Sequence, residues 1–407
     1  MNLNKKTVKD IDLQGKRVVM RVDFNVPLKD GVITDDTRIR AALPTIKYIL
    51  ENGASLSLLT HLGRPKGERK PEFSVKTAAD YLANLLGKDV KFVDDCVGEA
   101  VVEASKELKA GEVMVCENTR YHAEEDMKCK GDADKIAAQK AFAAELAKLG
   151  DVYVNDAFGT AHRAHASTAI ITEFMDKENC VAGFLLDKEI QYLGQAVANP
   201  EKPFVAIIGG AKVSGKLEVL TSLIEKVDTI LIGGGMAYTF LKSMGHNIGA
   251  SLCEDDLLDV AKETMAKAEA KGVKFLLPVD NKIADGFSND ANTEIVGNEI
   301  KDGWLALDIG PKTAEMYAAE IASAKTVVWN GPMGCFEMSN FADGTMIVCS
   351  AVADSDSVSI IGGGDSVAAV NKSGLADKMS HISTGGGASL EFLEGKDLPG
   401  VCALADR

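Results

Sequence analysis

The sequence predicts an α/β protein with two doubly wound domains, each built on a parallel sheet, joined by a helical hinge. Three observations lead to this fold class. Continuous apolar runs of strand length alternate with helical patterns along the chain, which is typical of parallel strands covered by helices on both faces. The alternation forms two series separated by one long helical stretch. At 407 residues, the chain is too long for one ordinary core of about 150 residues. Each domain is therefore expected to be Rossmann-like.

The first series contains five expected strands, at residues 16–26, 54–61, 90–93, 112–118 and 152–158. Helical periodicity over 35–53 and 134–150 places helices between them, and a glycine after the second is a stop signal. The second series contains five further strands, at residues 204–210, 229–235, 274–280, 326–332 and 358–364.

Between the two series, residues 185–203 have the pattern of one helix that ends near Asn199-Pro200. We expect this helix to connect the domains and to act as a hinge. The predicted limits are a first domain at 1–184, the hinge helix at 185–199, a second domain at 200–390 and a C-terminal tail at 391–407.

The composition excludes several classes of protein. The formal net charge is −15, which disfavours nucleic acid as a partner. No apolar run approaches the roughly 18 residues of a membrane span, and the first residues lack the apolar core of a secretory signal. We therefore expect a cytoplasmic protein. The eight cysteines form no C-x-x-C pair, so we expect reduced core thiols rather than a redox or metal site, with Cys129 exposed.

The arginines are unevenly distributed, because eight of nine precede residue 164 and the ninth is Arg407. Ligands of doubly wound sheets bind at the carboxyl ends of strands. Four arginines follow four different expected strands, at positions 38, 64, 120 and 163. A surface ion pair is the ordinary role of one arginine, but four in equivalent places favour a shared receptor for a phosphorylated, carboxylated small molecule. The neighbouring strand ends add Asp23, Asn25 and His61. A metal site at His162 and His165 is a minor alternative, because no third ligand is evident.

The second series has glycine clusters directly after its strands, at 209–216, 233–237, 330–334, 362–366 and 383–389. Glycine between a strand and a helix exposes backbone N–H groups to phosphate, so five clusters favour a nucleotide site over simple turns. The stretch GAKVSGKL resembles a P-loop but has Leu217 where Ser or Thr would hold Mg²⁺. Asp365 is then the natural magnesium ligand. No G-x-G-x-x-G occurs, which argues against a dinucleotide-binding oxidoreductase.

Taken together, RVDFNVP, DDTRIRAALPTI, THLGRP, ENTRYH, GTAHRAH, GGAKVSGK, GGGMAYTFL, WNGPMGCFE, GGGDS and STGGGASLEFLEGK resemble the phosphoglycerate kinase family, in order along nearly the whole chain. The resemblance implies reversible phosphoryl transfer from 1,3-bisphosphoglycerate to ADP, giving 3-phosphoglycerate and MgATP, in glycolysis and in the reverse direction. It also implies a monomer and a C-terminal tail that returns to the first domain.

Residue by residue, the resemblance implies three groups of side chains. Those holding phosphoglycerate are Asp23, Asn25, Arg38, His61, Arg64, Arg120 and Arg163. Those holding the nucleotide are Gly210, Ala211, Lys212, Lys216, Asn330, Glu337, Gly363, Gly364, Asp365 and Ser366, with Asp365 on magnesium. Those at the transferring phosphoryl group are Arg38, Lys212, Gly364 and Gly386. Two positions depart from the family pattern: Ser366 stands where Thr is common and keeps the hydroxyl, and Ala306 stands where Gly is common, at the family's adenine contact.

The chemistry agrees with this set, because the nucleophile of an acyl-phosphate kinase is already an anion and needs no general base. The protein then has two tasks, which are to position the reactants and to neutralise the charge of a loose transition state. Arginine, lysine and helix N-termini can do both. Two alternatives stay open: another small-molecule kinase on the same plan, and a two-domain protein that captures an anion without chemistry. The second explains the arginines but not the glycine clusters.

Overall fold

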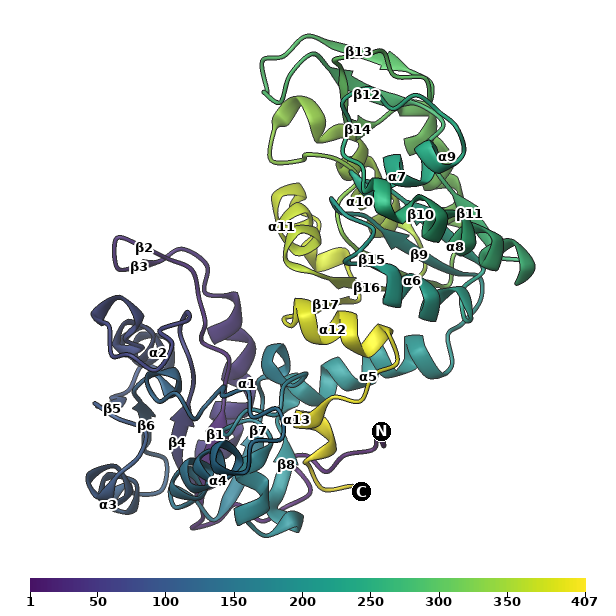
Figure 1. Cartoon of the computed structure of the whole chain (residues 1–407). Helices are drawn as coiled ribbons and strands as arrows, with labels where there is room; N and C mark the ends of the chain where they lie inside the picture. The colour runs from purple at the N-terminus through teal and green to yellow at the C-terminus, as the bar shows by residue number, and fades with distance from the viewer. The chain divides into compact units, whose positions relative to one another are not determined.

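The computed structural model divides the chain into two compact units (Figure 1). Unit 1 comprises Met1–Gln191 and Asp397–Arg407, and unit 2 comprises Tyr192–Lys396. The backbone of residues 1–407 is described, as is every side chain except that of residue 197. Each unit has its own six-stranded sheet, so the predicted fold class of two parallel-sheet α/β domains is confirmed.

Unit 1 is built on a parallel sheet with strand order β5-β6-β4-β1-β7-β8. The strands are β1 (Arg17–Arg21), β4 (Ser55–Leu59), β5 (Lys91–Val93), β6 (Val113–Cys116), β7 (Val152–Asn155) and β8 (Cys180–Ala182). The central strands β1 and β4 are buried along almost their whole length because both faces of the sheet are covered. A short hairpin, β2 (Leu28–Lys29) and β3 (Val32–Ile33), follows β1.

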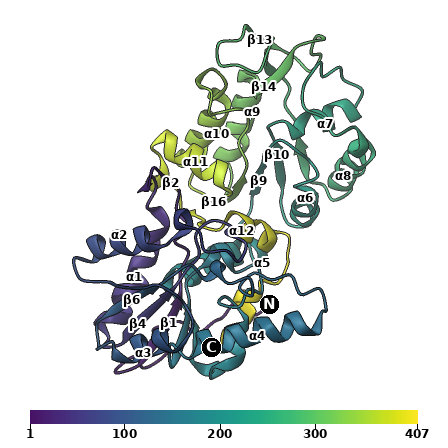
Figure 2. The same cartoon turned by 60° about the vertical axis from the view of Figure 1, so that its left-hand side comes forward.

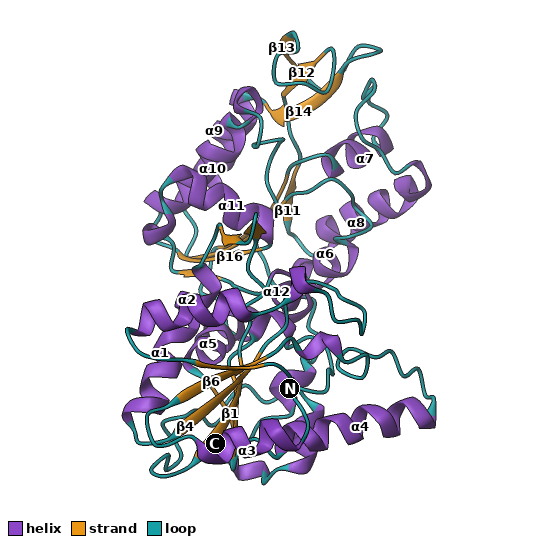
Figure 3. Ribbon diagram, turned by 90° about the vertical axis from the view of Figure 1, so that its left-hand side faces the viewer, coloured by secondary structure: helices purple, strands orange, loops and turns teal.

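The helices of unit 1 lie on both faces of its sheet (Figure 3). They are α1 (Thr37–Glu51), α2 (Lys76–Leu86), α3 (Glu99–Glu107) and α4 (Ala133–Ala147). α1 and α2 bury Ile46 and Leu82 in the same cluster as Met20 and Leu58 of the sheet, so this pair covers one face, and α3 and α4 cover the other. The expected helices 35–53 and 134–150 correspond to α1 and α4.

Unit 2 is built on a second parallel sheet with strand order β11-β10-β9-β15-β16-β17. Its strands are β9 (Phe204–Ile208), β10 (Thr229–Ile232), β11 (Lys274–Leu276), β15 (Thr326–Asn330), β16 (Val358–Gly362) and β17 (His381–Ile382). In order of appearance this is 3-2-1-4-5-6, the Rossmann order, which reverses between β9 and β15. The sheet of unit 1 has a different order, because β6 lies between β5 and β4.

The helices of unit 2 also cover both faces of the sheet (Figure 2). They are α6 (Leu217–Ile224), α7 (Met236–Ser243), α8 (Leu258–Ala270), α9 (Pro311–Ala322), α10 (Asp343–Asp354), α11 (Gly364–Ser373) and α12 (Gly386–Leu393). Tyr317 of α9, Val348 of α10 and Val370 of α11 share one buried cluster with Trp329 of the sheet. Those three helices therefore cover one face, and α6, α7 and α8 lie on the other.

Several elements were not expected from the sequence. The largest is an antiparallel sheet of unit 2, in the order β13-β12-β14. Its strands are β12 (Asn281–Ala284), β13 (Thr293–Val296) and β14 (Leu305–Ile309). Short 3-10 helices are η1 (Pro71–Phe73), η2 (Thr119–Tyr121), η3 (Phe158–Thr160), η4 (Ile170–Phe174), η5 (Lys177–Asn179), η6 (Asp255–Leu257), η7 (Ser339–Phe341) and η8 (Ala376–Lys378).

The limit between the units falls inside helix α5 (Phe184–Ala198), after Gln191. The chain re-enters unit 1 at Asp397, and α13 (Pro399–Cys402) then packs beside β7 and β8. Asn155 Nδ2 donates to the carbonyl of Gly400 at 3.2 Å. The two ends of the chain meet within unit 1 through an antiparallel bridge between Lys5 and Asp406.

The structure bears on three expectations from the composition. All eight cysteines are free thiols, but only Cys96, Cys116, Cys180 and Cys349 are buried in the core. The expected exposure of Cys129 is wrong, because its sulfur lies 3.4 Å from Gln139 Oε1 and the residue is half-buried, whereas Cys402 is exposed. Among the described residues, no helix has the length and apolar character that crossing a bilayer requires.

Candidate functional site

Unit 1 contains a cavity of about 990 Å³ at the carboxyl ends of its strands. All seven side chains expected to hold phosphoglycerate line this one cavity: Asp23, Asn25, Arg38, His61, Arg64, Arg120 and Arg163. If these seven side chains lay on unrelated surfaces, they would be separate surface ion pairs. They line one cavity instead.

The parallel sheet brings these residues together from distant parts of the chain. Asp23 and Asn25 follow β1, and His61 follows β4, which pairs with β1 on one side. Arg120 lies in η2 after β6, and Arg163 follows β7 and η3. Because parallel strands end at the same edge of a sheet, four loops with no sequence proximity share one rim.

The arginines of the cavity are held to different degrees. Arg38 Nη1 donates to the carbonyl of Asn25 at 2.8 Å and lies 3.3 Å from Asp23 Oδ1. Arg120 Nη1 donates to the carbonyl of Gly63 at 2.9 Å, and burial lowers its pKa. Arg64 is exposed at the rim. Two of these guanidinium groups are thus oriented by the protein itself.

The cavity is cationic although the chain as a whole is acidic. Six cationic side chains and two carboxylates line it. Burial and the nearby arginines lower the pKa of His165 to about 4 and that of His61 well below its usual range. Both imidazoles are therefore neutral at pH 7, and they can serve an anion as hydrogen-bond partners rather than as charges.

Sequence reasoning left out several residues that line the same cavity. They are Gly63, Lys66, Ala123, Asp126, Met127, Lys128, Gly159, Thr160 and Ala164. His162 and His165, which the sequence singled out after the fifth expected strand, line the cavity as well. Lys66 could have been found from the sequence, because it stands two residues after Arg64 in the loop that follows the second expected strand. Lys128 lies in a charged stretch with no such signal.

Unit 2 contains a cavity of about 500 Å³. Four of the residues expected to hold nucleotide line it: Gly210, Ala211, Glu337 and Asp365. Its remaining wall is largely apolar and includes Leu252, Leu307 and Met333, while the backbone at several glycines is open to it. Ala306, which stands where the family commonly has glycine, also lines the cavity.

Glycine is required where the loops after β9 and β15 meet, at the point where the strand order reverses. A Cβ on Gly209 would lie 2.0 Å from the carbonyl oxygen of Pro332, and one on Gly331 would lie 2.1 Å from that of Gly209. Gly331 also has a φ of 100°. The backbones approach so closely that only hydrogen fits between them.

The other expected nucleotide residues lie beside this turn. Lys216 contacts the side chain of Asn330, and desolvation lowers its pKa while the nearby Asp365 raises it. The amide of Gly331 donates to Ser366 Oγ at 2.6 Å, so serine supplies the hydroxyl at the position where the family commonly has threonine.

Two helix N-termini meet next to these residues. A Cβ on Gly386, the first residue of α12, would lie 3.3 Å from the Cα of Gly363 and 3.5 Å from the amide nitrogen of Gly364, where α11 begins. Lys212 is not part of the group, because it is exposed in the loop before α6 and does not line the cavity. The structure thus gathers the predicted nucleotide residues except Lys212.

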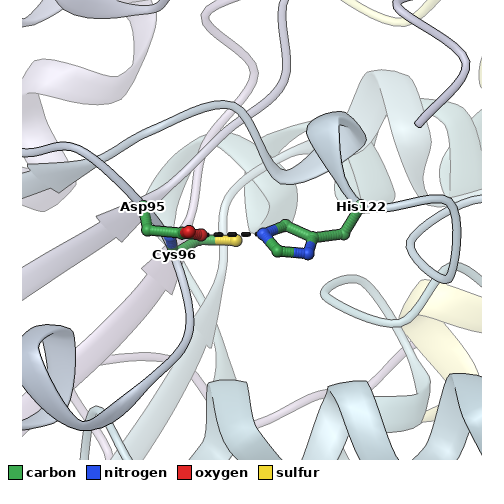
Figure 4. A group of neighbouring side chains, drawn as sticks. All are labelled: Asp95, Cys96 and His122. Carbon is green, nitrogen blue, oxygen red and sulfur yellow. Dashed lines mark hydrogen bonds and ion pairs between the residues drawn. The ribbon is translucent and has the colours of Figure 1, made fainter. Parts of the chain in front are cut away.

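A further cluster of unit 1, Asp95, Cys96 and His122, has the residue types of a metal centre (Figure 4). His122 Nε2 and Asp95 Oδ1 lie 2.7 Å apart, and the amide of Cys96 donates to the same oxygen. Arg69 Nη2 lies 3.7 Å from the other oxygen of Asp95. These contacts satisfy the carboxylate and tie the loop after β5 to η2, which is a structural role.

Known proteins resemble the chain throughout its length. A family model described as phosphoglycerate kinase matches residues 8–396. The phosphoglycerate kinase of Clostridium botulinum is 57% identical over 408 residues and covers 100% of both chains. That of Chloroherpeton thalassium is 55% identical and covers 99% of this chain and 100% of its own.

Solved structures agree with the sequence relatives. The phosphoglycerate kinase of Coxiella burnetii has a TM-score of 0.86 at 41% identity, and that of Pyrococcus horikoshii has a TM-score of 0.84 at 33% identity. Each alignment covers 98% of both chains. The chain therefore belongs to the phosphoglycerate kinase family, and it is a phosphotransferase of glycolysis.

Proposed function

We propose that the cavity of unit 1 binds 3-phosphoglycerate and 1,3-bisphosphoglycerate, and that the cavity of unit 2 binds ATP and ADP. One observation carries the assignment, namely that all seven side chains marked by the sequence line a single cationic cavity. An apolar pocket beside glycine-rich turns supports the nucleotide assignment.

In unit 1, the arginine forks bind the two anionic ends of the substrate. Arg64, Arg120 and Arg163 offer paired N–H donors to phosphate and carboxylate oxygens. Asp23 and Asn25 hold Arg38, which orients its guanidinium before a ligand arrives. His61 completes the wall as a neutral hydrogen-bond partner.

In unit 2, the apolar wall receives the base, and Glu337 accepts hydrogen bonds from the ribose hydroxyls. The phosphates lie at the adjoining starts of α11 and α12, where N–H groups and the helix dipoles favour negative charge. Lys216, held by Asn330, adds a positive charge.

We also propose Asp365 as the protein ligand of the nucleotide's magnesium. Its exposed carboxylate lies on the cavity wall, and carboxylate oxygens with substrate phosphates are the ligands that Mg²⁺ prefers. When bound, the ion neutralises phosphate charge. The residues present therefore fit the ion.

The reaction needs no proton transfer by the protein. The attacking group is a carboxylate in one direction and a diphosphate oxygen in the other, so positioning and charge neutralisation remain. Arg38 supplies positive charge to the transferring group, and the amides near Gly364 and Gly386 supply donors. Lys212, exposed in the loop before α6, adds its charge only once the units have closed.

Because the two cavities belong to separate units, transfer requires that the units bring their ligands together. We propose that α5 is the hinge of this closure, since the unit limit falls within it. We further propose a cytoplasmic monomer with small-molecule partners and no nucleic-acid partner, in keeping with the acidic charge.

A coupled assay that follows ADP formation from MgATP and 3-phosphoglycerate tests the proposal. We expect turnover that requires both substrates and stops when EDTA removes the metal, with Arg38→Ala as the inactive control. Turnover with another carboxylate but none with 3-phosphoglycerate would indicate a different kinase. Anion binding without turnover would indicate a binding protein.

A further inference from the structure

A fully buried ion pair lies beneath the cavity of unit 1. Arg21 ends β1 and Glu125 lies in the loop after η2, and both side chains have 0% exposure. Arg21 Nη2 lies 3.7 Å from Glu125 Oε1. Neither residue lines the cavity, so the pair does not contact a ligand bound there.

The arginine of this pair determines which nitrogen of His61 carries the proton. Arg21 Nη2 lies 3.1 Å from His61 Nδ1. A guanidinium has donors only, so Nδ1 must accept and the imidazole proton must lie on Nε2. Among the described residues, Nε2 has no protein hydrogen-bond partner. The N–H that remains is therefore available as a donor to the cavity that His61 lines.

The glutamate of the pair is hydrogen-bonded to two further segments that contribute residues to the cavity, namely η2 and the loop that carries Arg163. Glu125 Oε2 accepts from the amide of Ser167 at 3.0 Å, and its other oxygen accepts from the Ser167 hydroxyl. Thr119 Oγ1, next to Arg120, lies 3.3 Å from Oε1. The carboxylate thus joins the start of η2 to the loop that carries Arg163.

Ser167 closes the network between the two charges. Its hydroxyl accepts from Arg21 Nε at 2.7 Å while it donates to Glu125. Removal of one partner would leave a buried charge without compensation, and such a charge reorients the groups around it. The pair is thus connected to His61, which lines the cavity, to Thr119, next to Arg120, and to Ser167, two residues after His165.

We propose that Glu125 is a positioning residue of the phosphoglycerate site: through Arg21 it fixes His61 as the Nε2–H tautomer, and through Ser167 it fixes the Arg163 loop. The inference rests on the proposed function, because it concerns the same site. The pair prepares the wall before substrate arrives, so its loss affects phosphoglycerate and leaves the nucleotide unaffected.

The test combines kinetics with a spectroscopic readout on the full chain. In Glu125→Gln we expect KM for 3-phosphoglycerate to rise about tenfold, because small displacements of positioned groups are costly, with KM for MgATP unchanged. Proton–nitrogen correlation NMR, assigned with His61→Gln, should show one tautomer of His61 in the wild type and a mixture in the variant. A single tautomer with unchanged KM in Glu125→Gln would overturn the inference.

A second variant covers the case in which Glu125→Gln does not fold. Arg21→Lys keeps a positive charge against Glu125 but lacks the fork that reaches His61. If the ion pair served stability alone, Arg21→Lys would keep the wild-type KM and the single tautomer of His61. We expect instead a mixture of tautomers and a raised KM for 3-phosphoglycerate. Wild-type values of both in Arg21→Lys would contradict the inference.

The chain offers a matched control on the same strand. Arg17 begins β1 and pairs with Asp151 at 2.8 Å, at the opposite end of the sheet from the cavity. Asp151→Asn removes an ion pair of β1 and should leave KM and the His61 signal unchanged. Unchanged phosphoglycerate affinity in Arg64→Ala would instead contradict the site assignment itself, so the two failures are distinguishable.

Discussion

Arg38 and Arg64 line the same cavity, but the protein restrains them differently. Arg38 is bonded to the carbonyl of Asn25 and lies beside Asp23, whereas Arg64 is exposed at the rim. A restrained guanidinium can stabilise charge that develops during transfer, while a mobile one contributes mainly to binding.

We therefore expect Arg38→Ala to lower kcat by about a hundredfold or more, with a smaller effect on substrate affinity. Arg64→Ala should raise KM for 3-phosphoglycerate about tenfold and leave kcat within a fewfold. Steady-state kinetics with calorimetric binding measures both. Equal losses of kcat with unchanged affinity in both variants would contradict this division of roles.

A buried carboxyl of unit 1 predicts a dependence of stability on pH. Asp156 follows β7, and burial raises its pKa from 3.8 to about 7. Between these values the folded chain holds a proton that the unfolded chain has released. Stability therefore falls as pH rises, by on the order of 1 kcal/mol per pH unit.

Asp156→Asn removes this proton, so the free energy of unfolding of the variant relative to wild type should increase between about pH 4 and about pH 7. The amide fits the site because Oδ2 has no hydrogen-bond partner while Oδ1 accepts from Leu186 at 3.1 Å. Urea denaturation across this range measures the slope. Asp89→Asn, at an exposed position, is the control. If the free energies of unfolding of wild type and Asp156→Asn changed in parallel with pH, the expectation would be refuted.

The sequence predicted the seven ligand residues of the unit 1 cavity because they come after expected strands and because most of them are arginine or histidine, which are uncommon in this chain. Lysines were less informative, since they occur throughout the chain and their long side chains have no fixed direction. This is why Lys66 and Lys128 were not anticipated. The resemblance predicts that Lys212 flanks the transferring phosphoryl group, whereas its exposed side chain does not line the cavity of unit 2.

At the scale of elements, the nucleotide cavity depends on the contact between the loops after β9 and β15. The close approach of Gly209 to Pro332 leaves no room for a methyl group. Because the two strands pair along their length, a displacement of either loop acts directly on Gly210 and Ala211 in the cavity wall.

We expect Gly209→Ala to raise KM for MgATP and to lower the free energy of unfolding by about 1–3 kcal/mol, the usual cost of overpacking. Binding of 3-phosphoglycerate should not change, since its cavity belongs to unit 1. Gly286→Ala is the control, because a Cβ there meets nothing within 4 Å. Wild-type KM for MgATP in Gly209→Ala would show that the loops tolerate separation.

Most long buried strands and long helices could be predicted from the sequence, but β14 was missed although it is buried along most of its length. The antiparallel strands β12 and β13 lack the continuous apolar run of a covered strand. β12 contains asparagine and lysine although it is largely buried, and β13 contains threonine and glutamate and is largely exposed. β17 has two residues and derives its strand character from pairing with β16, which is a tertiary contact.

At the scale of the whole molecule, the chemistry requires two ligands bound to different units to meet. We expect the radius of gyration to fall when 3-phosphoglycerate and a nucleotide bind together, because closure excludes water from the transferring group. Small-angle scattering measures the change, with each ligand alone as the control. An unchanged radius with both ligands bound would count against a large closure.

The C-terminal segment makes unit 1 discontinuous in sequence. Unit 2 is one uninterrupted stretch, whereas unit 1 combines residues 1–191 with residues 397–407. The contacts of Gly400 with Asn155 and of Asp406 with Lys5 therefore form only after the whole of unit 2 has been synthesised. A fragment that ends before residue 397 consequently lacks part of unit 1, although it contains both sheets.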